Sequence, residues 1–391
     1  PGETRAIIDA ANRRGIPHTR LEKYLFTRPL FEKLVKGDDR HESGFLMLGN
    51  GVHQRILDGV FCIDRTAHLR NLAADKCRRL AILEKLDIPV FKPVEGTEAG
   101  QDVQFIIAIN GQITGAGELA SAIRHGLEDV HGSTIDAVLA ISRALDSASV
   151  VVSVVTEDIG QPLAPGGAAV LDFDVTPGLG TYLTADSDQD SELLQSAADA
   201  LVDWLFPADS RASIPIIAIT GTNGKTTTTR MVNHILMQAG GRPGMVCTEG
   251  IFVNGKEIAA GDYGAVTGHL NVLTNKDVDV AVLETHHRGI LNQGFAIKQC
   301  DIAVCLNVSE DHVVGGQAAG LEQKAKLKQA LPQRASHAVA LFADDPHCLA
   351  MLDSMTAENI SVVSMQYDVE ALRVLVGDSV TCFCVLEWIE N

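Results

Sequence analysis

The first half of the chain mixes helical periodicity with several short apolar runs. Four apolar positions within residues 3–15 share one face of a helix: Ala6, Ile7, Ala10 and Ala11. Three apolar runs are too short for a typical helix and predict strands: 103–109, 150–156 and 168–173. A further helix is expected over Ala197–Trp204. This half is therefore expected to combine helices with strands.

From Ile214 onward, apolar strands alternate with an amphipathic helix. Three short apolar runs predict buried strands: 216–220, 278–283 and 302–307. Residues 226–239 predict a helix whose apolar face comprises Met231, Val232, Ile235, Leu236 and Ala239. Strands alternating with helices are typical of α/β folds, so we expect a mostly parallel sheet here.

A polar segment separates the two patterns. Residues 208–213 have no apolar period, and Pro207 and Pro215 flank them. Linkers between domains have this composition. The sequence therefore predicts two domains, residues 1–206 and residues 207–391.

Composition narrows the class of protein. The chain has 391 residues, 46% of them hydrophobic, and a net charge of −18. This acidity argues against a nucleic-acid partner and against an anionic membrane surface. No apolar stretch is as long as a membrane span, the first residues are unlike a secretory signal, and the eight cysteines lack paired metal spacing. We expect a cytoplasmic protein with reduced thiols.

The strongest chemical signal is the segment Gly221-Thr222-Asn223-Gly224-Lys225-Thr226, between a predicted strand and a predicted helix. Glycines let backbone N–H groups approach phosphate oxygens, and the helix N-terminus favours negative charge. Lys225 adds a mobile cation, and Thr226 adds a hydroxyl that can reach Mg²⁺. Ile219 stands where the longer form of this loop has a glycine. The sequence predicts a short phosphate-binding loop for ATP.

Residues 219–229 resemble the nucleotide loop of the Mur ligases, most closely that of the cyanophycin synthetase family. The likeness continues through residues 248–251, 282–285 and 307–312, and it ends near residues 343–346. The resemblance implies that the second half is the central, P-loop domain of a Mur ligase, with ATP and Mg²⁺ as cofactors.

The resemblance also implies roles for individual residues. Gly221, Thr222, Asn223, Gly224, Lys225, Thr226, Thr227 and Asp345 would bind the nucleotide. Thr226 and Glu284 would hold one metal ion, and His312 a second one. Lys326 would be the family's metal-region lysine, although Lys324 and Lys328 nearby leave this register open. Lys225, Glu284, His312 and Lys326 would form the catalytic set.

The chain departs from the family beside Glu284. His286 and His287 stand where the family has Ala-Arg, and Thr267, Gly268 and His269 replace its Trp-Ser-Ala run. Adjacent residues at a strand end point in opposite directions. One of His286 and His287 can therefore face substrate while the other packs, packing alone is the alternative for both, and we do not expect the two to share a metal.

The first half resembles the ATP-grasp domain of the same family, an α+β fold. Lys92-Pro93 is similar to part of its lysine strand, but the Gly-rich lid is missing. Gln104 replaces an arginine, Ser153 an acidic ligand, and Asp172 and Asp174 a Glu-x-Asn pair. These changes favour a degenerate module over an active second site.

The implied activity is an ATP-dependent carboxylate–amine ligase that acts through an acyl phosphate at the Mur half. Its substrates would be a small molecule or acidic peptide and an amine, and the protein would be a homo-oligomer. We also expect the C-terminal Mur domain to be missing from this chain. The alternative is a catalytically impaired nucleotide-binding or assembly paralogue.

Overall fold

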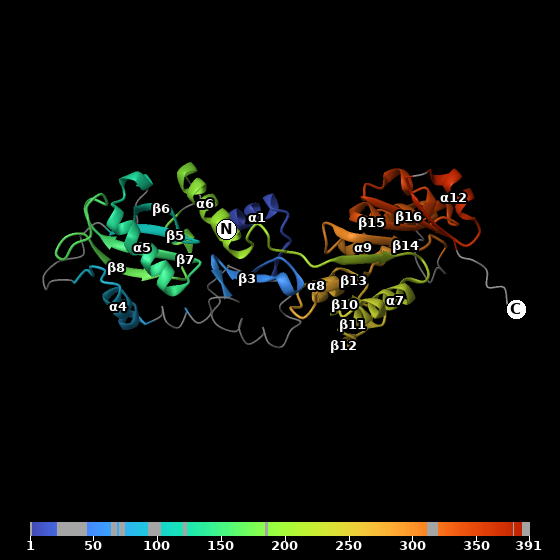
Figure 1. Ribbon diagram of the computed structural model, residues 1–391, viewed down its shortest axis with the longest axis horizontal. Coiled ribbons are helices and arrows are strands. Elements are labelled where there is room, and N and C mark those ends of the chain that lie inside the picture. Colours follow the sequence, from blue (N-terminus) through green and yellow to red (C-terminus); the bar gives the residue numbers. More distant parts are fainter. Residues whose placement is uncertain are drawn as a thin grey trace. The chain divides into compact units, whose positions relative to one another are not determined.

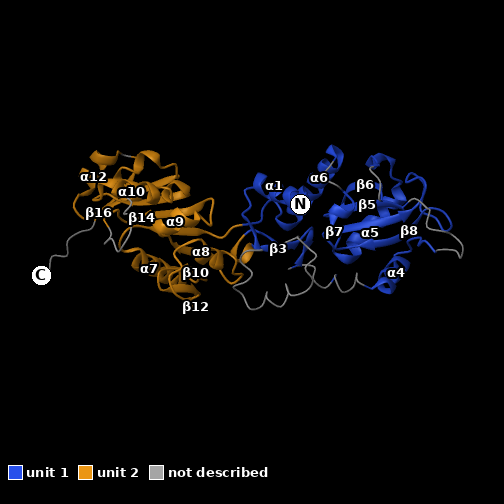
Figure 2. Cartoon of the chain, turned by 180° about the vertical axis from the view of Figure 1, so that it is seen from behind, with its two compact units in different colours: residues 1–49, 54–212 blue, residues 50–53, 213–391 orange. Residues whose placement is uncertain are grey.

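The computed structural model describes residues 2–21, 45–63, 69, 75–92, 103–119, 123–183, 187–310, 320–377 and 379–384. The chain divides into two compact units (Figure 2). Unit 1 contains residues 1–49 and 54–212, and unit 2 contains residues 50–53 and 213–391.

Unit 1 contains two antiparallel sheets (Figure 1). The small sheet has the order β1 (His18–Arg20), β2 (Leu46–Leu48), β3 (Arg55–Asp58) and β4 (Phe61–Cys62). The larger sheet has the order β6 (Gln112–Glu118), β5 (Val103–Ile109), β7 (Ser149–Val155) and β8 (Ala169–Asp174). The helices are α1 (Gly2–Arg13), α4 (Lys76–Lys85), α5 (Gly132–Leu145) and α6 (Asp188–Leu205).

Strand β5 shows how helices cover both faces of the larger sheet. Phe105 and Ile107 belong to the same apolar cluster as buried residues of α1 and α6. Ile106 and Ala108 belong to a second cluster with buried residues of α5. Because successive side chains of a strand point to opposite faces, a nearly continuous apolar run is needed when both faces are covered.

A charge cluster joins the C-terminal end of α1 to α6. Arg13 and Arg14 donate to Asp199 at 2.7 and 2.8 Å, and Arg14 also donates to Asp203 at 2.8 Å. Burial raises the pKa of Asp199, but the hydrogen bonds from Arg14 and Arg13 outweigh it and hold that pKa below its usual value.

Unit 2 is built on one nine-stranded sheet in the order β12-β11-β10-β13-β9-β14-β15-β16-β17. Its strands are β9 (Ile216–Thr220), β10 (Pro243–Val246), β11 (Gly250–Val253), β12 (Lys256–Ala260), β13 (Val280–Glu284), β14 (Cys300–Cys305), β15 (Ala335–Phe342), β16 (Asn359–Ser364) and β17 (Thr381–Cys384). In the part of the sheet with the order β10-β13-β9-β14-β15-β16-β17, every neighbouring pair is parallel. Strands β11 and β12 form an antiparallel hairpin that pairs with β10 through β11. The predicted mostly parallel α/β sheet is confirmed.

The helices of unit 2 are α7 (Lys225–Gln238), α8 (Val266–Leu273), α9 (His287–Gln293), α10 (Leu321–Gln329), α11 (Pro346–Leu349) and α12 (Val369–Val376). Helix α7 begins next to the carboxyl end of β9 and lies against β9, β10 and β13. The loop at the start of α7 is therefore at the carboxyl edge of the parallel strands, where α/β folds bind ligands.

The apolar face expected for α7 is wrong in part. Met231 and Ile235 are 60% and 62% exposed, whereas Thr229 and Asn233 are buried. The glycine loop fixes where α7 begins and so fixes its rotation, which turns Thr229 and Asn233 toward the protein. Hydrophobic periodicity does not contain this constraint.

Residues 50–53 belong to unit 2, although the surrounding chain belongs to unit 1. The Asn50 side-chain oxygen accepts from the Ile214 N–H at 2.7 Å, and the Val52 N–H donates to the Val278 oxygen at 2.9 Å. A Cβ added to Gly51 would lie 2.5 Å from the same Val278 oxygen. Only glycine fits this close approach, and Gly51 also has a φ of 52°.

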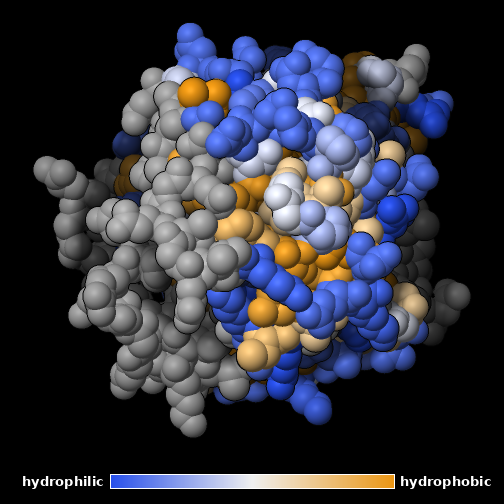
Figure 3. Space-filling view, turned by 90° about the vertical axis from the view of Figure 1, so that its left-hand side faces the viewer, coloured by the Kyte–Doolittle hydropathy of each residue, from blue (hydrophilic) through white to orange (hydrophobic). Residues whose placement is uncertain are grey.

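In the view of Figure 3, the coloured surface is largely hydrophilic, with hydrophobic residues gathered near the middle of the picture. Within the described ranges, no helix is long and apolar enough to cross a membrane.

Candidate functional site

The predicted phosphate loop connects β9 to α7. Gly224 caps α7 in the left-handed conformation with a φ of 83°. A Cβ on Gly221 would lie 3.0 Å from the Leu306 Cβ, so this glycine permits a close approach of neighbouring chain. The first N–H groups of α7 have no partners within the helix and point toward the loop. The loop and helix together therefore form a site suited to an anion.

Asn307 holds the loop in place. Its Oδ1 accepts from the N–H groups of Thr222 and Asn223 at 3.0 and 2.8 Å, and its Nδ2 donates to the Asn223 oxygen at 3.2 Å. Our sequence reasoning gave Asn307 no role. Its place at the end of the predicted apolar strand 302–307 was the available signal, because parallel strands end at one edge of a sheet.

Two lysines donate to carbonyl groups of the loop. Lys225 Nζ donates to the Thr222 oxygen at 2.7 Å. Lys328 Nζ, from α10, donates to the Gly221 oxygen at 2.7 Å, and Lys328 is only 1% exposed. Lys326, on the same helix, is exposed. Of these two α10 lysines, Lys328 is the one that contacts the loop.

Thr226 and Glu284 meet where α7 begins. Thr226 Oγ1 donates to Glu284 Oε2 at 2.9 Å and lies 2.9 Å from Thr248 Oγ1. The Thr248 N–H also donates to Glu284 Oε2, at 3.3 Å. The hydroxyl of Thr226 and the N–H of Thr248, from two segments distant in sequence, thus donate to one carboxylate that is 0% exposed.

Glu284 is held as a carboxylate. Burial raises its pKa, but the hydrogen bonds from His286 and Thr226 outweigh burial, so the net shift is downward. His286 Nε2 is 2.9 Å from Glu284 Oε1, and His286 Nδ1 is 3.5 Å from an Asp262 oxygen. An ionised carboxylate beside a hydroxyl is a ligand pair that suits Mg²⁺.

The two histidines after β13 differ from the expected strand geometry. The strand ends at Glu284, His286 caps α9, and His287 is the first residue of that helix. His286 contacts the carboxylate of Glu284 instead of simply facing substrate or packing. Gly264 makes room for it, since a Cβ there would lie 2.6 Å from the imidazole ring.

His269 supports the same strand end from within the protein. It is 3% exposed, and its Nε2 donates to the Glu284 backbone oxygen at 2.8 Å. Burial lowers the pKa of His269 to about 4. The imidazole is therefore neutral at pH 7 and adds no positive charge beside the carboxylate.

Asp345 takes part in local structure. It caps α11 through Oδ1, which accepts from the His347 N–H at 2.8 Å, and its Oδ2 accepts from the Val308 N–H at 2.6 Å. It thereby fixes the segment that follows Asn307. The predicted metal ligand His312 lies outside the described residues. Among those that are described, no three His, Cys, Asp or Glu side chains cluster as a metal site.

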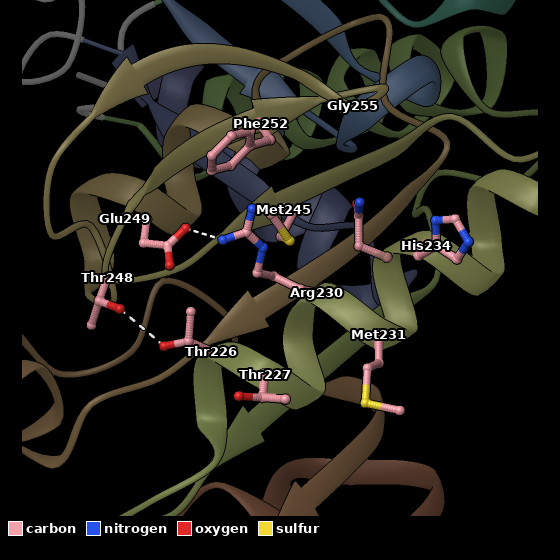
Figure 4. A pocket seen from close by; sticks show the side chains of 11 residues that line it. Thr226, Thr227, Arg230, Met231, His234, Met245, Thr248, Glu249, Phe252 and Gly255 are labelled. Atoms are coloured by element: carbon pink, nitrogen blue, oxygen red, sulfur yellow. Dashed lines mark hydrogen bonds and ion pairs between the residues drawn. The ribbon is translucent and has the colours of Figure 1, made fainter.

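A cavity of about 740 Å³ opens beside Thr226, between α7 and the β11–β12 hairpin (Figure 4). Thr226 and Thr248 lie at one end of it, and Arg230 and Glu249 point toward each other as an ion pair. Its wall includes Met245 and Phe252, and it also contains Thr227, Met231, Asn233, His234 and Gly255.

Unit 1 places the expected ATP-grasp positions in ordinary structural contacts. Asp172 makes a two-pronged ion pair with Arg79 at 2.7 and 2.8 Å. Asp174 accepts from the Thr176 N–H at 2.7 Å, and Gln104 pairs with His125 at 2.8 Å. Because Arg79 is paired with Asp172, it competes with a metal ion for that carboxylate.

Comparison with known proteins gives the family context. Residues 219–381 match the Mur ligase middle domain. A cyanophycin synthetase of Synechocystis sp. is 34% identical over 243 residues, which cover 62% of this chain and 27% of that protein. A UDP-N-acetylmuramoyl-L-alanyl-D-glutamate–2,6-diaminopimelate ligase of Caldanaerobacter subterraneus is 28% identical over 193 residues, covering 48% of this chain and 38% of that one.

A solved UDP-N-acetylmuramoyl-L-alanyl-D-glutamate–2,6-diaminopimelate ligase aligns with 26% identity and a TM-score of 0.36, over 43% of this chain and 35% of its own. The match to the Synechocystis cyanophycin synthetase, reported above, spans about a quarter of that protein's length. The chain is similar to cyanophycin synthetases, and its residues 219–381 match the Mur ligase middle domain.

Proposed function

We propose that this chain belongs to an ATP-dependent ligase that joins a carboxylate to an amine, with unit 2 as the site of phosphoryl transfer. The observation that carries the proposal is the contact of Thr226 with Glu284 at the mouth of a glycine loop. It puts a hydroxyl and an ionised carboxylate beside a helix N-terminus. The similarity to cyanophycin synthetases supports a ligase over a nucleotide-binding paralogue.

The proposed reaction has two steps. A substrate carboxylate oxygen attacks the γ-phosphorus of ATP, and the bond from that phosphorus to the bridging oxygen of ADP breaks. The amine then attacks the acyl phosphate carbon, phosphate leaves with the bonding electrons, and the nitrogen loses a proton. Both steps spread negative charge over phosphoryl oxygens, which fixed positive groups stabilise.

The described residues supply those groups. The first N–H groups of α7 face the loop, and Lys225 would exchange its bond to the Thr222 oxygen for a phosphate oxygen. Mg²⁺, when bound, would neutralise charge on the phosphates. Thr226 and Glu284 would hold it, and the remaining ligands would be water and phosphate oxygens, as this ion prefers.

Further assignments follow from the family resemblance. His312 would hold a second metal ion, and Asp345 would lie on the nucleotide side. Lys326 is the metal-region lysine by resemblance, whereas the contact of Lys328 with Gly221 favours Lys328. In unit 1, the ion pair of Asp172 with Arg79 favours a degenerate ATP-grasp-like module that no longer binds metal.

The test is release of ADP by the full chain with Mg-ATP, a panel of acidic peptides and a panel of amines. We expect ADP release that depends on both an acid and an amine, and that Lys225→Ala abolishes. Lys85→Ala, which removes an exposed lysine of α4 in unit 1, is the control for loss of a lysine. Binding of Mg-ATP without turnover under any acid and amine pair would instead support the paralogue.

A further inference from the structure

His286 contacts the carboxylate that the proposed reaction uses, but that reaction gives the imidazole no task of its own. Its Nε2 lies 2.9 Å from Glu284 Oε1. A carboxylate can only accept, so Nε2 carries the hydrogen and donates it to Oε1. The other oxygen, Oε2, accepts from the Thr226 hydroxyl at 2.9 Å and from the Thr248 N–H at 3.3 Å. The two oxygens of Glu284 therefore have different partners, and His286 occupies one of them.

The imidazole of His286 is held in place by its surroundings. Its Nδ1 lies 3.5 Å from Asp262 Oδ1, and its backbone N–H donates to the Gly264 oxygen at 3.0 Å. Gly264 lies directly against the ring, because an added Cβ would be 2.6 Å from it. The side chain of His286 is only 19% exposed. The ring therefore keeps its position beside Oε1, and Oε1 keeps its donor.

The Oε2 side of Glu284 lies toward the cavity beside α7. Thr226 and Thr248, which both donate to Oε2, line that cavity and lie together at one end of it (Figure 4). An ion that enters from the cavity therefore meets the carboxylate at Oε2. Thr226 Oγ1 and Oε2 are 2.9 Å apart. Two neighbouring oxygens around an octahedral ion have about this spacing when the bonds are about 2.0–2.1 Å long, as they are for Mg²⁺.

Mg²⁺ and Ca²⁺ differ in how they use a carboxylate. Mg²⁺ demands near-ideal octahedral geometry, for which the two oxygens of one carboxylate are too close together. Ca²⁺ takes six to eight oxygens at about 2.3–2.6 Å and accepts both oxygens of one carboxylate. A donor fixed on Oε1 leaves only Oε2 for a metal ion. The arrangement around Glu284 therefore suits the smaller ion.

We propose that His286 is a positioning residue that selects the metal ion: by holding Glu284 Oε1, it restricts this carboxylate to binding through one oxygen and favours Mg²⁺ over Ca²⁺. His286 acts through Glu284 and does not itself touch the ion. This inference rests on the phosphoryl-transfer site proposed above, in which Thr226 and Glu284 hold Mg²⁺.

The test compares the Mg²⁺ and Ca²⁺ complexes of a non-hydrolysable ATP analogue by calorimetry of the full chain. Each ion is in excess, so that the analogue is fully complexed, and the measured quantity is the ratio of the two affinities. We expect the wild type to prefer the Mg²⁺ complex by about tenfold, and this ratio to fall about fivefold in His286→Ala. Equal binding of the two complexes by the wild type would overturn the proposal. So would a ratio in His286→Ala that stays within about twofold of the wild-type ratio.

The ratio separates metal selection from a merely structural role of His286. Both ions carry the same charge, so a change in local charge affects both affinities alike and cancels in the ratio. His286→Gln, whose Nε2 can replace the imidazole donor to Oε1, should keep the wild-type ratio. His337→Ala is the matched control, because it removes a histidine that pairs with Glu358 at 2.9 Å on the surface, and it should also keep the ratio.

The same measurement distinguishes this inference from the proposed function. Failure of the wild type to bind either complex would count against the phosphoryl-transfer site itself. Tight binding of the Mg²⁺ complex by the wild type, with an unchanged ratio in His286→Ala, would count against the assignment of His286 alone.

Discussion

The N–H of Thr222 is shared between two oxygens of Asn307, the backbone oxygen at 2.9 Å and the side-chain Oδ1 at 3.0 Å. The start of the phosphate loop is thereby fixed to the segment after β14. Asn307→Ala should loosen the loop and weaken Mg-ATP binding about tenfold, which corresponds to about 1.4 kcal/mol. Calorimetry of wild type and variant with Mg-ATP measures this difference in affinity. The backbone hydrogen bond remains in the variant, so the melting temperature should change little. Unchanged Mg-ATP affinity would show that the Asn307 side chain is not needed to hold the loop.

The hydroxyl of Thr226 should matter more than its size. Thr226→Val keeps the shape but removes the donor to Glu284, and we expect Mg-ATP affinity to fall by about 2 kcal/mol or more. Thr226→Ser keeps the hydroxyl and should bind within about threefold of the wild type. A larger loss of affinity in Thr226→Ser than in Thr226→Val would argue that the methyl group, through packing, is the important feature.

Lys326 and Lys328, two of the three lysines of α10, should behave differently. Lys328 is buried and donates to the Gly221 oxygen. We therefore expect Lys328→Met to lower both the melting temperature and Mg-ATP affinity. Lys326 is exposed, and Lys326→Met should change the free energy of unfolding by no more than about 0.5 kcal/mol. A larger loss of activity in Lys326→Met than in Lys328→Met would restore Lys326 as the metal-region lysine.

Gly51 should be intolerant of a methyl group. Gly51→Ala places a Cβ against the Val278 oxygen, and we expect unit 2 to lose about 1–3 kcal/mol of stability in urea unfolding. Gly15→Ala is the matched control, because Gly15 also has a positive φ but nothing lies within 4 Å of its added Cβ. Similar losses of stability in both variants would show that backbone strain alone, and not the clash with the Val278 oxygen, causes the effect.

The contribution of Asp199 to stability should depend on pH. The folded state lowers its pKa, so the stabilisation is present above the unfolded pKa and is lost as pH falls through the folded value. Asp199→Asn should therefore cost about 1 kcal/mol at pH 7, given partial exposure, and the difference should vanish in strong acid. Asp9→Asn, in an exposed pair with Arg5, should have almost no effect at either pH.

The strands and the loop could be predicted because each depends on local sequence. The run at 216–220 is buried from both sides, and Gly224 must adopt a left-handed φ, so both leave direct signals. The contact of Lys328 with Gly221 could not be predicted, because it depends on the rotation of α10 against a loop 107 positions away. The same holds for His286, whose position follows from the chain turning into α9 directly after Glu284.

The segment at residues 50–53 has a consequence for biosynthesis. Asn50 bonds to Ile214, which lies 164 positions later, so the ribosome completes this segment long before its partner exists. Loop closure over such a separation is slow compared with local pairing. These four residues must remain available until the segment that begins at Ser213 has been synthesised. Unit 2 is therefore complete only after Ile214 has been synthesised, and a truncation that removes residues 50–53 should destabilise the later-synthesised half.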